Sequence, residues 1–102
     1  MYSIIVYIPT SHLEIVKQAM FTHGAGQLGN YSCCCWQVRG LGQFYANENS
    51  NAFIGFPQTL TQVDEYRVEM ICDTENLSAV LAAMKEAHPY EEPAFMVLNL
   101  VT

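Results

Sequence analysis

Two features that could do chemistry lie next to each other in the first half of the chain. Gly24, Gly26 and Gly29 have the G-x-G-x-x-G spacing of a dinucleotide-binding loop, and a run of three cysteines follows at positions 33–35. In a dinucleotide site, the glycines follow a strand and open a helix, so that the pyrophosphate meets unpaired amides. Here the glycines are expected to leave a helix and enter a strand. This order excludes a dinucleotide fingerprint.

Two interpretations of the glycine segment stay open. The simpler one is a turn that needs left-handed backbone at several positions, which glycine adopts without steric cost. The alternative is a small-anion site, because successive backbone amides of such a turn can converge on a negative charge. The second interpretation makes Gly24, Gly26, Gly29 and Tyr31 candidate ligand-binding residues.

The cysteine run suggests a second kind of chemistry. Residues 31–38 are expected to be extended, so Cys33 and Cys35 would share one face of a strand and could offer two thiolates to a metal ion. A closed zinc site needs four ligands and usually C-x-x-C spacing, so small apolar side chains in a core or interface are the competing interpretation. No export signal is recognised, and we expect the four cysteines to be reduced thiols.

The segment His88-Pro-Tyr-Glu-Glu-Pro93 places an imidazole and two carboxylates at the expected end of a helix. His88, Glu91 and Glu92 are candidate ligands for a divalent metal, and His88, Tyr90 and Glu91 are candidates for a small-ligand site. The competing interpretation is structural: the histidine interacts with the helix dipole, the tyrosine packs and the glutamates are solvated. Without a Ser-His-Asp set, a phosphate loop or an H-E-x-x-H motif, no catalytic residue is assigned.

The elements that must position these residues follow from hydrophobic periodicity. Residues 2–8 are apolar on both alternating faces, which is typical of a central strand. A helix is expected over residues 11–22, with Ser11 and Glu14 as a capping box and Gly24 as the left-handed residue that closes it. An extended segment is then expected over residues 31–38, which bends or bulges at Gly40 and Gly42 and continues to residue 45, followed by a loop over 46–60. A strand is expected over 62–72 and a helix after it, capped by Asp73 or Thr74 and ending at His88. The last expected element is a strand over 94–101.

The order strand, helix, strand, strand, helix, strand predicts an α+β, ferredoxin-like sandwich, with two helices on one face of a four-stranded antiparallel sheet. We expect residues 1–102 to form a single domain. In the third strand, Glu65, Arg67 and Glu69 alternate with Tyr66, Val68, Met70 and Cys72, and are expected on the face that the helices leave free. Because the first and last strands are apolar on both sides, a closed oligomer should bury part of that free face.

Composition narrows the classes of partner. The net charge is −6, which argues against binding to nucleic acid or to an anionic membrane. Hydrophobic residues make up 51% of the chain and charged residues only 14%, so some apolar surface is expected to meet another subunit. No apolar run approaches the length of a membrane span, and we expect a cytoplasmic protein.

Five motifs carry a resemblance to a known family across essentially the whole chain. They are GAGQLGNY at 24–31, GLGQF at 40–44, FIG at 53–55, EYRVE at 65–69 and AHPYEE at 87–92. Together they resemble the YqfO-type domain, which is found as an insert in many bacterial members of the NGG-interacting-factor family of dinuclear-metal proteins. The chain departs from the family pattern in its long loop, at Ala46, Asn49 and Ala52.

The resemblance implies a fold related to CutA and the PII signalling proteins, which assemble as trimers. It also implies that the dinuclear metal centre belongs to flanking domains and not to this chain. Three hypotheses follow. The first is a stand-alone, non-catalytic homotrimer that acts as a regulatory or small-ligand-binding module and needs no cofactor. The second is a CutA-like protein that binds a divalent metal, and the third is a small enzyme acting on a nucleotide or other anion at a subunit interface.

Overall fold

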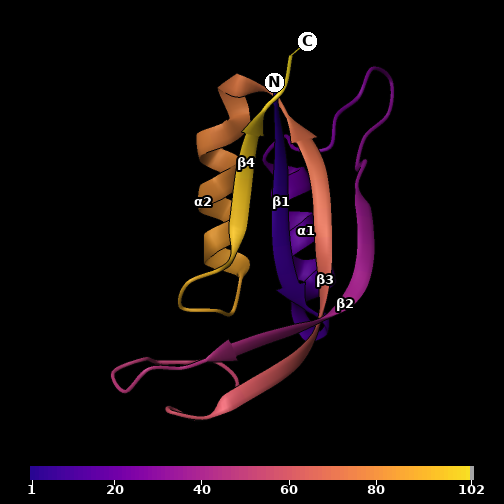
Figure 1. The fold of residues 1–102 in the computed structure, drawn as a ribbon. Helices are drawn as coiled ribbons and strands as arrows, with labels where there is room; N and C mark the ends of the chain where they lie inside the picture. The colour runs from indigo at the N-terminus through magenta and orange to yellow at the C-terminus, as the bar shows by residue number, and fades with distance from the viewer. Residues whose placement is uncertain (102) are drawn as a thin grey trace.

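The four strands form one antiparallel sheet in the order β2-β3-β1-β4, and the two helices lie together on one face of it (Figure 1). The structure is a computed structural model that describes residues 1–101 of the 102. The elements are β1 (Tyr2–Pro9), α1 (Leu13–Thr22), β2 (Trp36–Tyr45), β3 (Leu60–Cys72), α2 (Leu77–Ala87) and β4 (Phe95–Asn99). The predicted ferredoxin-like fold is therefore confirmed.

The core lies between the sheet and the helices, as the two periodicities predict. From β1, Ile4, Val6 and Ile8 are fully buried, and each helix adds buried side chains at three- and four-residue spacing. The other fully or nearly fully buried core members are Val16 and Met20 of α1, Ala25 of the segment after α1, Val80 and Met84 of α2, and Val68, Met70 and Cys72 of β3. None of the helices within residues 1–101 is long and apolar enough to cross a membrane.

The helix-free face of the sheet, which we call the open face, carries the alternating charges of β3. In the strand register, Ile5 pairs with Glu69 and Tyr7 pairs with Arg67, which places these charges opposite the helix side, as predicted. The open face is nevertheless partly apolar. Ile5 is only 3% exposed, whereas other apolar side chains of the open face remain exposed, namely Trp36, Val38, Met96 and Leu98.

The helix starts differ from the predicted ones. A short 3-10 turn, Thr10–His12, precedes α1, and within it the Ser11 hydroxyl pairs with Nδ1 of His12 at 2.8 Å. The capping-box prediction was wrong because this tight turn follows β1 directly and holds Ser11 away from the helix amides. No side chain caps the second helical segment either, so Asp73 is not a side-chain cap, and the Thr74 hydroxyl accepts instead from the N-terminal ammonium at 3.3 Å.

The segment before β2 is also less regular than predicted. The second strand begins only at Trp36, and Cys33 has a left-handed φ of 57°. An extended strand would not tolerate that backbone angle, so Cys33 and Cys35 do not share a strand face, and that prediction was wrong. The last strand is shorter than expected at both ends, and covers Phe95–Asn99.

Beyond the helices, β2 and β3 continue as a bent hairpin that reaches away from the body of the molecule (Figure 1). We call residues 41–64, the outer part of this hairpin with its connecting loop, the arm. The register is one-for-one from Trp36 opposite Glu69 to Tyr45 opposite Leu60, so the strand bends without the bulge that was the alternative at Gly40 and Gly42.

Candidate functional site

The glycine segment uses its amides to hold the chain together. The Gly24 amide donates to the Phe21 carbonyl at 3.1 Å, and the Gly26 amide donates to the Ile71 carbonyl at 2.8 Å. The Gly26 carbonyl in turn accepts from the Cys34 amide at 2.9 Å. Because each of these glycine amides already has a carbonyl partner, neither is free to bind an anion. The structure thus supports the turn interpretation.

All three glycines have the positive φ that the turn interpretation requires: 112° at Gly24, 77° at Gly26 and 57° at Gly29. Gly29 lies in an exposed tight turn, closed by paired backbone hydrogen bonds of 2.9 Å between Leu28 and Tyr31. The Tyr31 side chain is exposed and projects from this turn. These residues lie at the end of the sheet where β1 begins.

His88 sits at the opposite end of β1 and is a structural residue. It is 5% exposed, its Nε2 lies 2.7 Å from the Tyr7 carbonyl oxygen, and its Nδ1 accepts from the Tyr90 amide at 3.1 Å. A carbonyl only accepts and an amide only donates, so the ring is neutral with its proton on Nε2. Burial lowers the pKa of His88, the Tyr7 carbonyl opposes this shift, and nearby His12 adds to it. Both ring nitrogens are therefore occupied.

Because both ring nitrogens are bound to backbone, His88 fixes the direction in which residues 89–92 leave α2. Its ring centroid lies 4.8 Å from that of Tyr90, whose hydroxyl donates to Oε2 of Glu65 at 3.4 Å. Burial, with the neighbouring Glu65 carboxylate adding to it, raises the pKa of Tyr90 to about 12. Burial also raises the pKa of Glu65, and the tyrosine hydroxyl partly offsets that increase.

Glu65 and Gly42 form a matched pair across β2 and β3. A Cβ atom built on Gly42 would overlap the Glu65 carboxylate, so the missing side chain leaves the space in which that carboxylate lies. Sequence reasoning placed Glu65 on the open face but did not recognise it as a site residue. Its signal was a glycine inside a strand pattern, which often marks the close approach of another group.

The arm loop folds back onto the segment that follows α2. The Asn51 amide donates to Oε1 of Glu91 at 3.1 Å. The ring of Phe53 lies edge-on to His12, with centroids 5.4 Å apart, and 6.5 Å from the ring of Tyr90. Phe53 is a second residue that sequence reasoning missed, because the loop has no periodicity from which a contact could be inferred.

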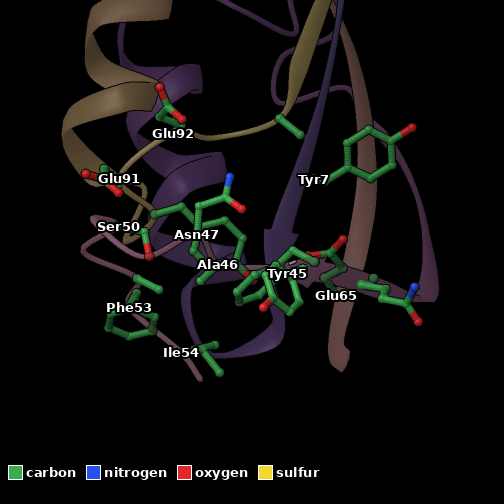
Figure 2. A pocket seen from close by; sticks show the side chains of 16 residues that line it. Tyr7, Tyr45, Ala46, Asn47, Ser50, Phe53, Ile54, Glu65, Glu91 and Glu92 are labelled. Carbon is green, nitrogen blue, oxygen red and sulfur yellow. Dashed lines mark hydrogen bonds between the residues drawn. The ribbon is translucent and has the colours of Figure 1, made fainter. Parts of the chain in front are cut away.

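Between the arm and this segment lies a pocket of about 340 Å³ (Figure 2). Glu91 and Glu92 come from the segment after α2, whereas Tyr45 of the arm and Glu65 of the adjoining part of β3 lie on the other side. The pocket wall is formed by Tyr7, Gly42, Gln43, Phe44, Tyr45, Ala46, Asn47, Ser50, Ala52, Phe53, Ile54, Glu65, Tyr90, Glu91, Glu92 and Ala94. Of the predicted ligand residues, this pocket contains Tyr90 and Glu91, with His88 directly behind Tyr90.

The predicted metal ligands do not come together within one chain. Cys35 lies beside Trp36 and Ser3 near the start of β1, whereas His88 binds the carbonyl of Tyr7 near its end. Within residues 1–101, no three His, Cys, Asp or Glu side chains are grouped so that they could hold a metal ion. The four cysteines are free thiols.

Solved structures place this fold in a known class. CutA from Nostoc, described as PII-like, superposes on 98% of this chain and 81% of its own with a TM-score of 0.68 at 17% identity. The CutA of Archaeoglobus fulgidus, a periplasmic divalent cation tolerance protein, gives a TM-score of 0.69 at 14% identity over 98% of this chain and 84% of its own. At these identities the likeness establishes the CutA/PII-like fold alone.

Proteins of higher sequence identity are related to NIF3. A Bacillus cereus protein related to NIF3 matches 99% of this chain with a TM-score of 0.84 and 36% identity, and the match takes up 26% of that protein. A Mycobacterium tuberculosis GTP cyclohydrolase 1 type 2 homolog is 45% identical over 97 residues, which are 95% of this chain and 26% of the relative. The chain is similar to one region of these NIF3-related proteins, and this region has the CutA/PII-like fold. The chain spans about a quarter of the length of these relatives, and no family model matches it.

Proposed function

We propose that this chain forms a homotrimeric, non-catalytic module that binds a small ligand or regulates a partner, without the dinuclear metal centre that the NIF3-family resemblance places in flanking domains. The activity in the name of the GTP cyclohydrolase 1 type 2 homologs is not proposed for this chain, because the chain corresponds to about a quarter of their length. The free thiols and the acidic charge of −6 support a cytoplasmic site of action away from nucleic acid and membranes.

The observation that carries the trimer is the exposed apolar surface of the open face. Trp36 is 59% exposed and lies with Val38 on β2, and Met96 and Leu98 lie on the same face of β4, at the other edge of the sheet. A monomer of this size rarely leaves several large apolar side chains together in water. A second copy offers the same apolar groups, and a closed ring would cover them on every subunit.

Two observations support a binding role over the metal-binding and enzymatic alternatives. The imidazole of His88, directly behind Tyr90 of the pocket wall, has both nitrogens bound to backbone. The titratable side chains that line the pocket are three glutamates and three tyrosines, and Tyr90 has a pKa of about 12. Within residues 1–101, these side chains do not form a ligand set that closes around a metal ion.

Sedimentation equilibrium at micromolar concentration tests the trimer. We expect a particle of three times the chain mass for the wild-type protein. The double variant Trp36→Lys/Leu98→Lys should sediment as a monomer, because six lysines would meet at the apolar contact of the trimer. As the matched control, Ile15→Lys places the same charge on an equally exposed position of α1, and should remain trimeric. A wild-type protein that stays monomeric contradicts the proposal.

A further inference from the structure

We infer that the pocket between the arm and the segment after α2 binds a small organic cation with an apolar body, such as an alkylammonium or guanidinium compound. This inference rests on the proposed binding role and names the ligand class for it. It also replaces the small anion that the glycine segment suggested, because the pocket lies elsewhere and carries the opposite charge.

The charge of the pocket wall determines the sign of the ligand. Its charged side chains are Glu65, Glu91 and Glu92, and no lysine, arginine or histidine is among its sixteen lining residues. An anion in this space would meet three carboxylates with no compensating positive group. A cation would be attracted both by these carboxylates and by the overall charge of −6.

The aromatic side chains of the wall favour an organic cation over a metal ion. Phe44, Tyr45, Phe53 and Tyr90 contribute rings from the arm and from the segment after α2, and Tyr7 adds a fifth from β1. Aromatic faces attract ammonium and guanidinium groups and also cover alkyl carbon. A divalent metal ion would instead need converging oxygen, nitrogen or sulfur ligands, and no group of three such acidic, histidine or cysteine side chains occurs within residues 1–101.

Polar atoms of the wall have hydrogen-bonding capacity left over. The Glu65 carboxylate receives only the long 3.4 Å bond from Tyr90, and Glu91 uses one carboxylate oxygen for the Asn51 amide. The Ser50 hydroxyl is buried in the wall without a partner in the described structure. A buried polar group without a partner is costly, and a ligand N–H group that donated to these oxygens would remove that cost.

The volume of the pocket limits the size of the ligand. A volume of about 340 Å³ lies at the lower end of the range for small-molecule pockets, so the ligand is a metabolite-sized compound and not a peptide. Agmatine, which has an ammonium and a guanidinium group on a short alkyl chain, and putrescine, which has two ammonium groups, are suitable probes. Succinate is the matched anion, because it has two negative groups on a comparable chain.

Isothermal titration calorimetry with the full chain tests the inference. We expect agmatine or putrescine to bind saturably with one site per chain, and to bind more weakly as salt is added. Glu65→Gln keeps the shape of the side chain and removes its charge, and should weaken binding about tenfold or more. Phe53→Leu removes a ring and keeps an apolar side chain, and should weaken binding by roughly two- to fivefold.

Glu75→Gln is the control, since it removes the same charge from an exposed residue outside the pocket wall and should leave the affinity within about twofold. Amide chemical shifts of the isotope-labelled wild-type protein give a readout that needs no variant. They should change mainly in residues 44–54 and 88–94 when agmatine is added.

Three outcomes would overturn the inference: no saturable binding of either amine, saturable binding of succinate in the same pocket, or shift changes centred on the glycine segment. Saturable binding of Zn²⁺ that is lost in Glu65→Gln, with no binding of the amines, would also overturn it in favour of a metal site. Sedimentation separates these results from the proposed function. A protein that is trimeric but binds no amine would refute only the inferred cation site. A protein that is monomeric but binds agmatine would refute only the proposed trimer.

Discussion

At the scale of single residues, His88 explains why the segment after α2 has a defined position. Its neutral ring joins the backbone of Tyr7, near the end of the central strand, to the backbone of Tyr90, which enters the pocket wall. Loss of either hydrogen bond would leave a buried backbone N–H or C=O group without a partner. The histidine therefore acts as a positioning residue for Tyr90, and through Tyr90 for the Glu65 carboxylate.

We expect stability to depend on the protonation of His88. Its pKa in the folded chain lies below the ordinary value of 6.5, so the unfolded chain takes up this proton first as the pH falls. The contribution of the neutral ring to the free energy of unfolding is complete above the unfolded pKa and decreases below it. Urea unfolding of wild type and His88→Gln, from about pH 8 to about pH 5, measures the difference.

The difference between the two proteins isolates His88, because Glu65 and the other titrating groups are common to both. Glu65 acts in the opposite direction, since its raised pKa lets the folded chain hold a proton that the unfolded chain has lost. We expect the stability advantage of wild type over His88→Gln to shrink as the pH falls below about 6.5. An advantage that stays constant or grows on acidification would contradict the lowered pKa of His88 and the neutral state of its ring.

At the scale of elements, the connection from α1 to β2 depends on glycine to different degrees along its length. At Gly26, which has a φ of 77°, an added Cβ would lie 2.8 Å from the Cys34 carbonyl oxygen and 2.9 Å from the Phe21 ring. At Gly29, which has a φ of 57°, an added Cβ would have no neighbour within 4 Å. The two positions therefore share the backbone requirement but differ in available space.

Gly29→Ala should lower the free energy of unfolding by about 1–2 kcal/mol, the cost of a left-handed conformation for a residue with a Cβ. Gly26→Ala should cost about 1–3 kcal/mol more, because the new methyl group also overlaps a backbone carbonyl that cannot rotate away. Urea denaturation of the two variants beside wild type provides the comparison. If both substitutions lower the free energy of unfolding by the same amount, the contacts of the new methyl group at Gly26 carry no energetic cost.

At the scale of the whole molecule, the arm gives the chain an elongated shape. The principal extents are 46 × 24 × 23 Å, and the radius of gyration is 14.3 Å. A compact chain of this length would have a radius of about 13 Å. The arm also exposes apolar side chains that no helix covers, with Leu41 67% exposed and Tyr45 and Leu60 similarly accessible. An uncovered apolar hairpin is suited to contact a neighbouring subunit.

We expect Leu41→Ser/Leu60→Ser to weaken the proposed trimer and to leave the fold of the monomer intact. Neither side chain belongs to the buried core, so the effect of each substitution on the monomer should stay within about 0.5 kcal/mol. Sedimentation velocity over a dilution series should show dissociation at higher concentration than for wild type. The matched change Ile15→Ser on α1 should have no such effect. If Leu41→Ser/Leu60→Ser and wild type dissociate over the same concentration range, the arm makes no subunit contact.

Much of the fold could be predicted because local periodicity dictates which side chains can be buried. The apolar stripe of α2 and the alternating charges of β3 each allow only one orientation against a common core, and the two-sided apolar pattern of β1 is typical of a central strand. The helix starts and the cysteine segment were predicted less well. There, the 3-10 turn at Thr10–His12 and the left-handed Cys33 replaced the regular backbone that the residue types favour.

The sequence by itself determined the order of the elements, the face of each that is buried and the family resemblance, because these depend on residues close together in the chain. Only the tertiary structure decided where the chemistry lies. His88 and Tyr7 are 81 residues apart in sequence, and Glu91 and Asn51 are 40 apart. Contacts at such separations leave no periodic signal, so only the tertiary structure shows that the amides of Gly24 and Gly26 already have carbonyl partners. Folding also showed that the acidic, aromatic pocket forms between the arm and the segment after α2.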